Sequence, residues 1–293
     1  MYVPIATFMF GLALASPLNY KRAGKTPVFF LAGDSTTAKI TSGGGGKYRS
    51  WGDGFLSTLV NGATGINFGH NGRTTVSFVQ GGDWANVLSE VKNHTGVYDP
   101  FVESSFPCKQ GRVELRVYPR DIIIWDQRME YGKKVLSNIQ FGHNDQKEAA
   151  NISIAEFSNN LANMVSDVRT AGGTPILITS LSRRNYNSSG LIIEDLAPQV
   201  AATVSVGSKT STAVLHLNEE STKYLNAVGE EDAYEYNRVE GDYTHLNVAG
   251  QTVFGNMVGW LLEKSCLGAK VDGFLGLNGT IVEDIEAGVF ILP

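Results

Sequence analysis

Short apolar runs alternate with amphipathic segments along most of this chain. Several of the runs are continuously apolar, which is typical of strands that are covered on both faces of a sheet. We therefore expect strands at Val28–Ala32, Gly65–Phe68, Ile139–Phe141, Pro175–Thr179 and Val214–Leu217.

The segments between these runs carry helix patterns. Ile154–Arg169 places its apolar residues on one stripe, and Ser153 with Glu156 forms a capping-box pattern at its start. We expect two further helices at Leu196–Val206 and Val248–Leu262. Strands that alternate with helices predict an α/β domain with a parallel central sheet and helices on both faces.

One segment, Glu103–Asn138, departs from this pattern. It is richer in Lys and Arg than its neighbours, and its apolar run Ile122–Trp125 has no partner in the pattern. Without it, Phe101 and Val102 would continue directly into Ile139–Phe141 as one buried strand. Long unpatterned insertions are uncommon in compact domains, so we interpret the segment as a translated intron, with a genuine surface insertion as the alternative.

Composition and charge narrow the class of protein. The 293 residues are 42% hydrophobic and 18% charged, which is ordinary for a globular chain with one large core. The formal net charge is -5, and no run of Lys and Arg exceeds two residues. We therefore expect neither a nucleic-acid surface nor, beyond the N-terminal region, a membrane span.

The N-terminal region has the features of a secretory signal. Ile5–Ala15 is apolar but too short to span a bilayer, and Ala13-Leu14-Ala15 matches a cleavage site before Ser16. The alternative is a buried first helix. We expect a signal peptide at 1–15, a linker or short propeptide at 16–27, and an extracellular protein glycosylated at its four Asn-x-Ser/Thr sequons, Asn93, Asn151, Asn187 and Asn278.

The two cysteines, Cys108 and Cys266, are too few to define a disulfide framework. Whether they pair with each other is left open by the sequence.

Three short motifs carry the candidate chemistry. Gly33-Asp34-Ser35 follows the first predicted strand, Gly142-His143-Asn144-Asp145 follows the third, and Asp242-Tyr243-Thr244-His245 lies near the last helix. A serine needs a base to become a nucleophile, and His245 is the one histidine of the five with a carboxylate three residues before it in a polar loop. Each motif alone is typical of an ordinary turn, but together they supply a nucleophile, a base and its orienting carboxylate.

A fourth motif, Asn67–Thr74, follows the second strand. Gly72 within it permits a close approach of the backbone to a ligand. Its N–H, the N–H of Ser35 and the side-chain amide of Asn144 can converge on a developing oxyanion.

These four blocks in order, Gly-Asp-Ser, Asn-x₄-Gly-Arg-Thr, Gly-His-Asn-Asp and Asp-x-x-His, resemble the SGNH (GDSL) hydrolase superfamily. The Gly-Asp-Ser-Thr-Thr-Ala start, Trp51-Gly52-Asp53 and the Gly-Arg-Thr variant resemble its fungal rhamnogalacturonan acetylesterase branch. The resemblance implies a three-layer, flavodoxin-like sandwich without a cofactor, spanning 28–266 and followed by a C-terminal tail at 267–293.

The resemblance also implies the roles of the site residues. Ser35 is the expected nucleophile, His245 the base and Asp242 its orienter, while Ser35, Gly72 and Asn144 form the oxyanion hole. The implied reaction removes O-acetyl groups from a pectic polysaccharide such as rhamnogalacturonan through an acetyl-Ser35 intermediate. The alternatives are a broad small-ester or lipid esterase and a non-catalytic wall-binding protein.

Substrate contacts are less specific in the sequence. Trp51, Trp84 and Tyr48 are candidates for stacking on sugars, with packing in the core or at the rim as the alternative. Arg73 is a candidate for binding a galacturonate carboxylate or, alternatively, for holding its own loop. His143 with Asp145 lacks a third and fourth ligand, so we expect no metal, and we expect a monomer whose partner is the acetylated polysaccharide.

Overall fold

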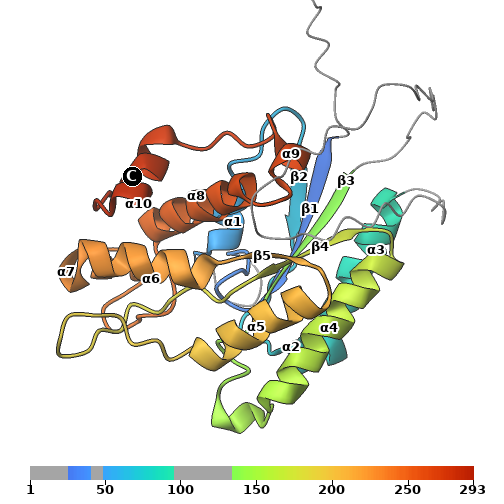
Figure 1. The fold of residues 1–293 in the computed structure, drawn as a ribbon, viewed down its shortest axis with the longest axis horizontal. Coiled ribbons are helices and arrows are strands. Elements are labelled where there is room, and N and C mark those ends of the chain that lie inside the picture. The colour runs from blue at the N-terminus through green and yellow to red at the C-terminus, as the bar shows by residue number, and fades with distance from the viewer. Residues whose placement is uncertain (1–25, 41–48, 96–133) are drawn as a thin grey trace, which may run out of the picture.

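A computed structural model describes residues 26–40, 49–95 and 134–293 of the chain (Figure 1). Within these residues the strands form one five-stranded parallel sheet in the order β2-β1-β3-β4-β5. The strands are β1 (Pro27–Gly33), β2 (Thr64–Asn67), β3 (Lys134–Gln140), β4 (Thr174–Ile178) and β5 (Ala213–Leu215). This order is the flavodoxin-like one, so the predicted fold class is confirmed.

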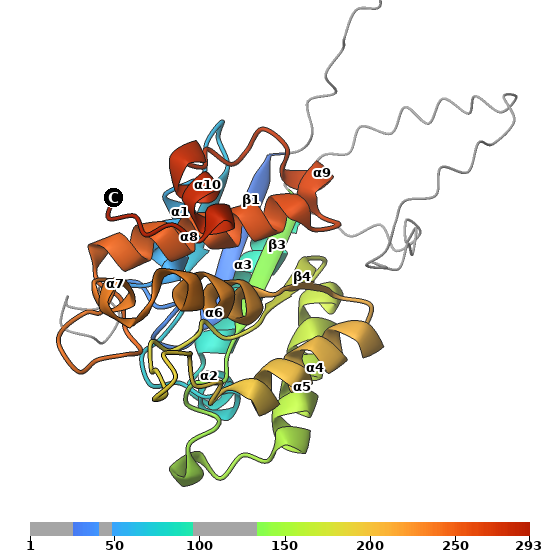
Figure 2. The ribbon, with the colours of Figure 1, turned by 60° about the vertical axis from the view of Figure 1, so that its left-hand side comes forward.

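Helices cover both faces of the sheet (Figures 1 and 2). On one face lie α1 (Trp51–Leu56), α6 (Leu217–Val228) and α8 (Val248–Lys264), together with the short α7 (Glu230–Tyr234), α9 (Gly268–Val271) and α10 (Gly279–Ala287). On the other face lie α2 (Thr75–Gln80), α3 (Asp83–Thr95), α4 (Ile154–Thr170) and α5 (Ala197–Lys209). A 3₁₀ turn, η1 (Glu148–Ala150), precedes α4.

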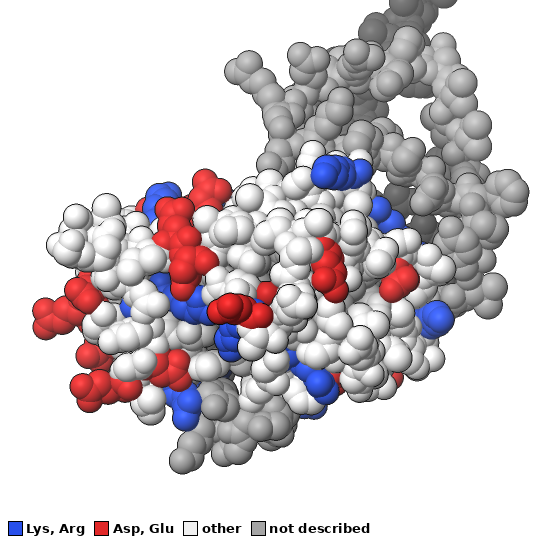
Figure 3. All heavy atoms as spheres, turned by 90° about the horizontal axis from the view of Figure 1, so that it is seen from below, with Lys and Arg blue, Asp and Glu red and all other residues white. Residues whose placement is uncertain are grey.

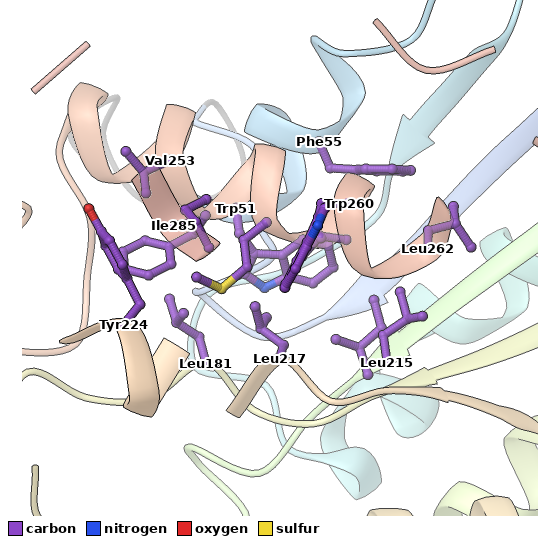
Figure 4. Close-up of a cluster of buried hydrophobic side chains, with 14 of the residues drawn as sticks. Trp51, Phe55, Leu181, Leu215, Leu217, Tyr224, Val253, Trp260, Leu262 and Ile285 are labelled. Carbon is purple, nitrogen blue, oxygen red and sulfur yellow. The ribbon is translucent and has the colours of Figure 1, made fainter. Parts of the chain in front are cut away.

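The core divides into two clusters because side chains alternate across the sheet. Phe29 and Leu31 of β1 face the α8 side, whereas Val28, Phe30 and Ala32 face the α4 side. Figure 4 shows the α8-side cluster, in which the rings of Trp51 and Trp260 lie among aliphatic side chains from several helices. The continuous apolar run of β1 thus reflects burial on both faces.

Two of the three predicted helices begin at the expected residues, and the third, α5, begins one residue late at Ala197 and runs to Lys209. The side chain of Ser153 accepts the N–H of Glu156 at the start of α4, and that of Asn247 accepts the N–H of Gly250 at the start of α8. At β5 the prediction ran too far, because Leu217 already belongs to α6 and only the run up to Leu215 is extended.

The expectation for Glu103–Asn138 needs a correction at its end. Lys134–Asn138 is part of the central strand β3, which pairs with β1 from Pro27↔Lys134 to Gly33↔Gln140. The segment therefore does not extend to Asn138, because residues 134–138 supply most of a strand that the sheet needs. Residues 103–133, Cys108 among them, lie outside the described residues.

The expected C-terminal tail is also different in the structure, because it packs onto the core of the domain. Ile281 and Ile285 of α10 are buried in the α8-side cluster. The hydroxyl of Tyr236 donates to the carbonyl of Ile291 at 2.7 Å. Residues 267–293 thus complete one side of the same domain. None of the described helices is long and apolar enough to cross a membrane.

Candidate active site

The predicted motif residues meet at one edge of the sheet. Ser35 follows β1, Gly72 lies in the loop after β2 and Asn144 follows β3. These strands are neighbours in the sheet, so their carboxyl ends open on the same edge, which faces downwards in Figure 1 and towards the viewer in Figure 3. His245 reaches this edge from the loop before α8, where Leu246 bridges to Asn237.

Ser35, His245 and Asp242 form a hydrogen-bonded chain. Nε2 of His245 lies 2.9 Å from Oγ of Ser35, and Nδ1 of His245 lies 3.0 Å from both carboxylate oxygens of Asp242. Oδ1 of Asp242 also accepts the backbone N–H groups of Thr244 and His245, at 3.3 and 3.0 Å. This Asx turn explains why an Asp-x-x-His spacing places the carboxylate beside the ring.

The electrostatics of the pair match the needs of a general base. Burial lowers the pKa of His245 below its ordinary value, although the charge of Asp242 opposes the shift. Burial by itself would raise the pKa of Asp242, but hydrogen bonds from His245 and the charge of His245 outweigh it, and the pKa lies below its usual range. At neutral pH the carboxylate is therefore ionised while the imidazole is free to accept a proton.

This pair predicts the acid limb of the pH profile. Catalysis needs neutral His245, and its pKa in the folded protein lies below 6.5. We expect kcat/KM for an ester to be retained as pH falls to 6.5 and to be lost only as pH falls through that lower pKa. Steady-state rates in overlapping buffers measure the limb, and a limb centred above pH 6.5 would contradict the assignment.

The three donors that the sequence analysis selected lie in the loops at this edge of the sheet. Among the described residues, the N–H groups of Ser35 and Gly72 have no acceptor. Gly72 adopts a left-handed φ of 75°, which favours glycine. The side-chain nitrogen of Asn144 donates to the carbonyl of Arg73 at 3.0 Å, and because an amide nitrogen carries two hydrogens, the other remains for a ligand.

Asp145 joins the loops that carry Asn144 and Gly72. Its Oδ1 accepts the N–H of Thr75 at 2.8 Å and the hydroxyl of Thr75 at 2.6 Å. Burial raises the pKa of Asp145, and the charge of Asp34 adds to the shift. Because Thr75 starts α2 directly after the Gly72 loop, this buried carboxyl group fixes the spacing between two of the three donors.

His143 has a structural position. Its Nε2 donates to the carbonyl of Leu181 at 2.9 Å, and its Nδ1 lies 3.5 Å from Oδ2 of the buried Asp34. Burial would raise the pKa of Asp34, but the charge of His143 and hydrogen bonds from His143 and Thr36 outweigh it and hold the pKa below its usual value. Within the described part of the chain, no three His, Cys, Asp or Glu side chains are grouped to hold a metal.

Two arginines after β4 hold the loop of His245, and sequence analysis assigned neither a role. Arg184 is fully buried, and its Nη2 donates to the carbonyl of His245 at 2.8 Å while its backbone N–H donates to that of Tyr243 at 2.9 Å. Nε of Arg183 donates to the hydroxyl of Thr244 at 3.1 Å. The available signal was an Arg-Arg pair close behind a buried strand, at the edge where the motifs lie.

We expect Arg184→Met to lower kcat by roughly 10- to 100-fold with a smaller change in KM, since displacement of a catalytic group by about 1 Å can have an effect of that size. Burial lowers the pKa of Arg184 to about 10, so the side chain stays charged at neutral pH and holds the loop as a charged donor. Kinetics and thermal melting of the variant measure the effect. Arg169→Met is the matched control, because Arg169 contacts Ser211 and Thr212 instead. Wild-type kcat in a folded Arg184→Met protein would contradict this role.

The substrate-contact predictions for the two tryptophans are wrong. Trp51 is fully buried, and its Nε1 donates to Oε1 of Gln140 at 3.3 Å. Trp84 is 3% exposed, and its Nε1 donates to Oδ2 of Asp167 at 2.9 Å. Both rings are held inside the domain and cannot stack on a sugar.

Arg73 holds its own loop, which was the second alternative for this residue. Its Nε donates to Oδ2 of Asp83 at 2.8 Å. Its backbone carbonyl is the acceptor that orients Asn144, so the residue acts on the site through its main chain. Tyr48 lies outside the described residues.

The sequons are all at the surface. The asparagine of each sequon is exposed, namely Asn93, Asn151, Asn187 and Asn278. Asn278 also caps α10 by accepting the N–H of Ile281.

Comparisons with known proteins agree with the geometry. The model of the family described as GDSL-like lipase/acylhydrolase matches residues 29–258. The rhamnogalacturonan acetylesterase RhgT of Bacillus subtilis (strain 168) is 28% identical over 95 residues, which are 32% of this chain and 41% of that protein. The match thus spans less than half the length of this curated relative.

Solved structures share the fold. Protein YXIM from Bacillus subtilis superposes with a TM-score of 0.61 at 18% identity, covering 82% of this chain and 57% of that one. A catalytic mutant of Axe2, an acetylxylan esterase from Geobacillus stearothermophilus, superposes with a TM-score of 0.52 at 13% identity, covering 87% and 98%. Likenesses at these identities concern the architecture and not the substrate.

Proposed function

The chain belongs to the GDSL-like lipase/acylhydrolase family, and on this premise we propose that it is a secreted serine esterase that removes O-acetyl groups from a pectic polysaccharide such as rhamnogalacturonan. The observation that carries the proposal is the 2.9 Å contact between Nε2 of His245 and Oγ of Ser35, with Asp242 behind the ring. A partly buried nucleophile–base–carboxylate chain, with N–H donors in the neighbouring loops, is the arrangement that acyl transfer requires.

In the proposed mechanism Oγ of Ser35 attacks the acetyl carbonyl carbon while Nε2 of His245 takes the serine proton. Asp242 holds the ring and stabilises the imidazolium that forms. The N–H groups of Ser35 and Gly72 and the side-chain amide of Asn144 bind the negative oxygen of the tetrahedral intermediate.

The intermediate then collapses, and the sugar oxygen leaves with the proton from Nε2. Water enters, gives a proton to His245 and attacks the acetyl group on Ser35, which releases acetate and restores the free serine. Each proton passes through one nitrogen, so the scheme needs no further acid or base.

The assignment of a polysaccharide substrate is supported by the RhgT similarity, whose name describes a rhamnogalacturonan acetylesterase. The test is acetate release from acetylated rhamnogalacturonan, with acetylated xylan, p-nitrophenyl acetate and a long-chain p-nitrophenyl ester as comparators. We expect the pectic polymer to be preferred. Faster turnover of the long-chain ester would favour the lipid-esterase alternative, and no turnover of any ester would favour a non-catalytic wall-binding protein.

Secretion and glycosylation belong to the same proposal, and their support is the apolar stretch Ile5–Ala15 and the four exposed sequons. We also propose a monomer. When the chain is expressed in a secreting yeast, the protein should be found in the culture medium, with an N-terminus at Ser16 or directly after Lys21-Arg22. Its mass should fall on treatment with an N-glycosidase, whereas retention in the cells without a mass shift would contradict the proposal.

A further inference from the structure

Three tyrosines form a row beside the catalytic loop. The ring centroids of Tyr234 and Tyr243 are 5.1 Å apart with an interplanar angle of 39°, and those of Tyr186 and Tyr234 are 6.1 Å apart at 75°. All three side chains are partly exposed. We call Tyr186, Tyr234 and Tyr243 the tyrosine row.

One member of the row, Tyr243, belongs to the loop that carries Asp242 and His245. Tyr243 lies between Asp242 and His245, at the corner of the Asx turn that Asp242 closes with the N–H groups of Thr244 and His245. Its carbonyl accepts the backbone N–H of Arg184 at 2.9 Å, which fixes the main chain at this corner. The main chain at Tyr243 is therefore held close to His245, and the ring of Tyr243 packs against that of Tyr234.

The other two rings have fixed positions as well. The hydroxyl of Tyr186 donates to the carbonyl of Leu225 at 2.7 Å, and its ring packs on the α8-side core. The hydroxyl of Tyr234 donates to Glu230 within α7. An aromatic surface whose rings are already held in place loses little conformational entropy on binding a ligand.

The charges around the row point to a neutral ligand. The helix that carries Tyr234 begins with Glu230, Glu231 and Asp232, and Glu235 follows it. In Figure 3, acidic side chains gather at the left, the side on which α7 lies in Figure 1. Negative side chains around an aromatic surface repel a uronate and leave a neutral sugar unaffected.

The cations near the catalytic loop do not offset this. Arg183 is paired with Asp195, and Nη1 of Arg238 lies 3.3 Å from Oδ2 of Asp242. Both guanidinium groups thus already face carboxylates of the protein itself. The third arginine at this loop, Arg184, is fully buried and does not present its charge at the surface.

We propose that the tyrosine row is a subsite that stacks on a neutral sugar residue of the polysaccharide next to the acetylated one. The inference rests on the proposed function and adds the part of the substrate that the enzyme recognises. The apolar C–H face of a pyranose ring packs on the face of a tyrosine, while its hydroxyl groups stay in water. In a polymer that alternates neutral and acidic sugars, the row selects the neutral one.

A binding experiment tests this without catalysis. In a Ser35→Ala background, calorimetric titration uses a deacetylated rhamnogalacturonan hexasaccharide, which alternates neutral and acidic sugars, and hexagalacturonate, which is entirely acidic. Tyr243→Ala should weaken binding of the first by roughly 3- to 10-fold, the size expected for one lost ring contact. Tyr243→Phe, which keeps the ring, should bind as the parent does. Tighter binding of hexagalacturonate than of the mixed hexasaccharide, lost on removal of the Tyr243 ring, would overturn the neutral-sugar assignment.

A kinetic experiment separates binding from positioning of His245. With Ser35 present, kcat/KM is measured for the acetylated oligosaccharide and for p-nitrophenyl acetate, and the first is divided by the second. Tyr243→Ala should lower this ratio by roughly the 3- to 10-fold expected for binding. Tyr234→Leu should also lower it. An unchanged ratio in both variants would mean that the row only supports the loop, and the inference would fail.

The two proposals fail in different ways. If the wild type cleaves p-nitrophenyl acetate but releases no acetate from acetylated rhamnogalacturonan, the proposed function is wrong, and the titrations still decide whether the row binds a neutral sugar. If acetate is released but neither binding nor the ratio depends on the rings, the function stands and the subsite is wrong.

Discussion

Ser35→Ala should abolish acetate release, with a loss in kcat of roughly 10⁴-fold or more. The expectation follows from the contact of 2.9 Å between Oγ of Ser35 and Nε2 of His245, because no other oxygen of the variant takes that position. A fluorophosphonate should label the wild type at Ser35 and leave the variant unlabelled. Acetate release and intact-mass analysis of the labelled protein measure the two effects.

A second serine serves as the matched control. Ser158 is partly exposed on α4, and its hydroxyl donates to the carbonyl of Ile154 within the same helix at 2.8 Å. Ser158→Ala should retain both turnover and labelling. Wild-type turnover by Ser35→Ala would show that another group is the nucleophile and would remove the basis for the proposed mechanism.

Asn144→Ala should lower kcat by roughly 10²- to 10³-fold and change KM much less. An oxyanion donor acts on charge that develops only in the transition state, so its loss affects the chemical step more than binding. The orientation of the amide by the carbonyl of Arg73 and by Nζ of Lys147, at 3.0 and 2.7 Å, means that little reorganisation is needed when the oxyanion forms. Steady-state kinetics on p-nitrophenyl acetate provide both constants.

The control for this variant is Asn163→Ala, since Asn163 is an exposed asparagine on α4. It should behave as the wild type. A rise in KM alone in Asn144→Ala would mean that the amide holds the substrate and that the oxyanion is bound elsewhere. Because the proposed mechanism uses no metal, a chelator should leave the rates of the wild type and both variants unchanged.

The strands show which parts of the fold are readable from sequence. β1 and β4 are continuous apolar runs because both of their faces are buried. Such a run can be recognised as a strand from the sequence alone. β3 was recognised only at its end, because Ser137 and Asn138 are polar and yet fully buried in the strand. Polar residues inside a strand interrupt the apolar run, and their burial follows from neighbouring strands that the sequence does not display.

The side chains of the site divide in a similar way. Ser35, Asp242 and His245 could be selected from local features, namely a serine after a strand and a carboxylate three residues before a histidine. The burial of Trp51 and Trp84 could not be read locally, because aromatic residues occur both in cores and at ligand surfaces. Arg184 was missed because charged side chains are rarely buried, and only its partners explain its position.

The amino-acid sequence by itself therefore determined the fold class, the loops that carry the motifs and the groups that we propose to react, because these depend on short-range pattern and residue type. The tertiary structure alone decided which groups meet. Ser35 and His245 are 210 residues apart in the chain, and their contact exists because the order of the strands and the packing of α8 return the last loop to the end of β1. Tertiary packing also buries Trp51, Trp84 and Arg184 and leaves the tyrosine row partly exposed. Burial depends on which faces of distant segments contact one another, and the sequence does not display those contacts.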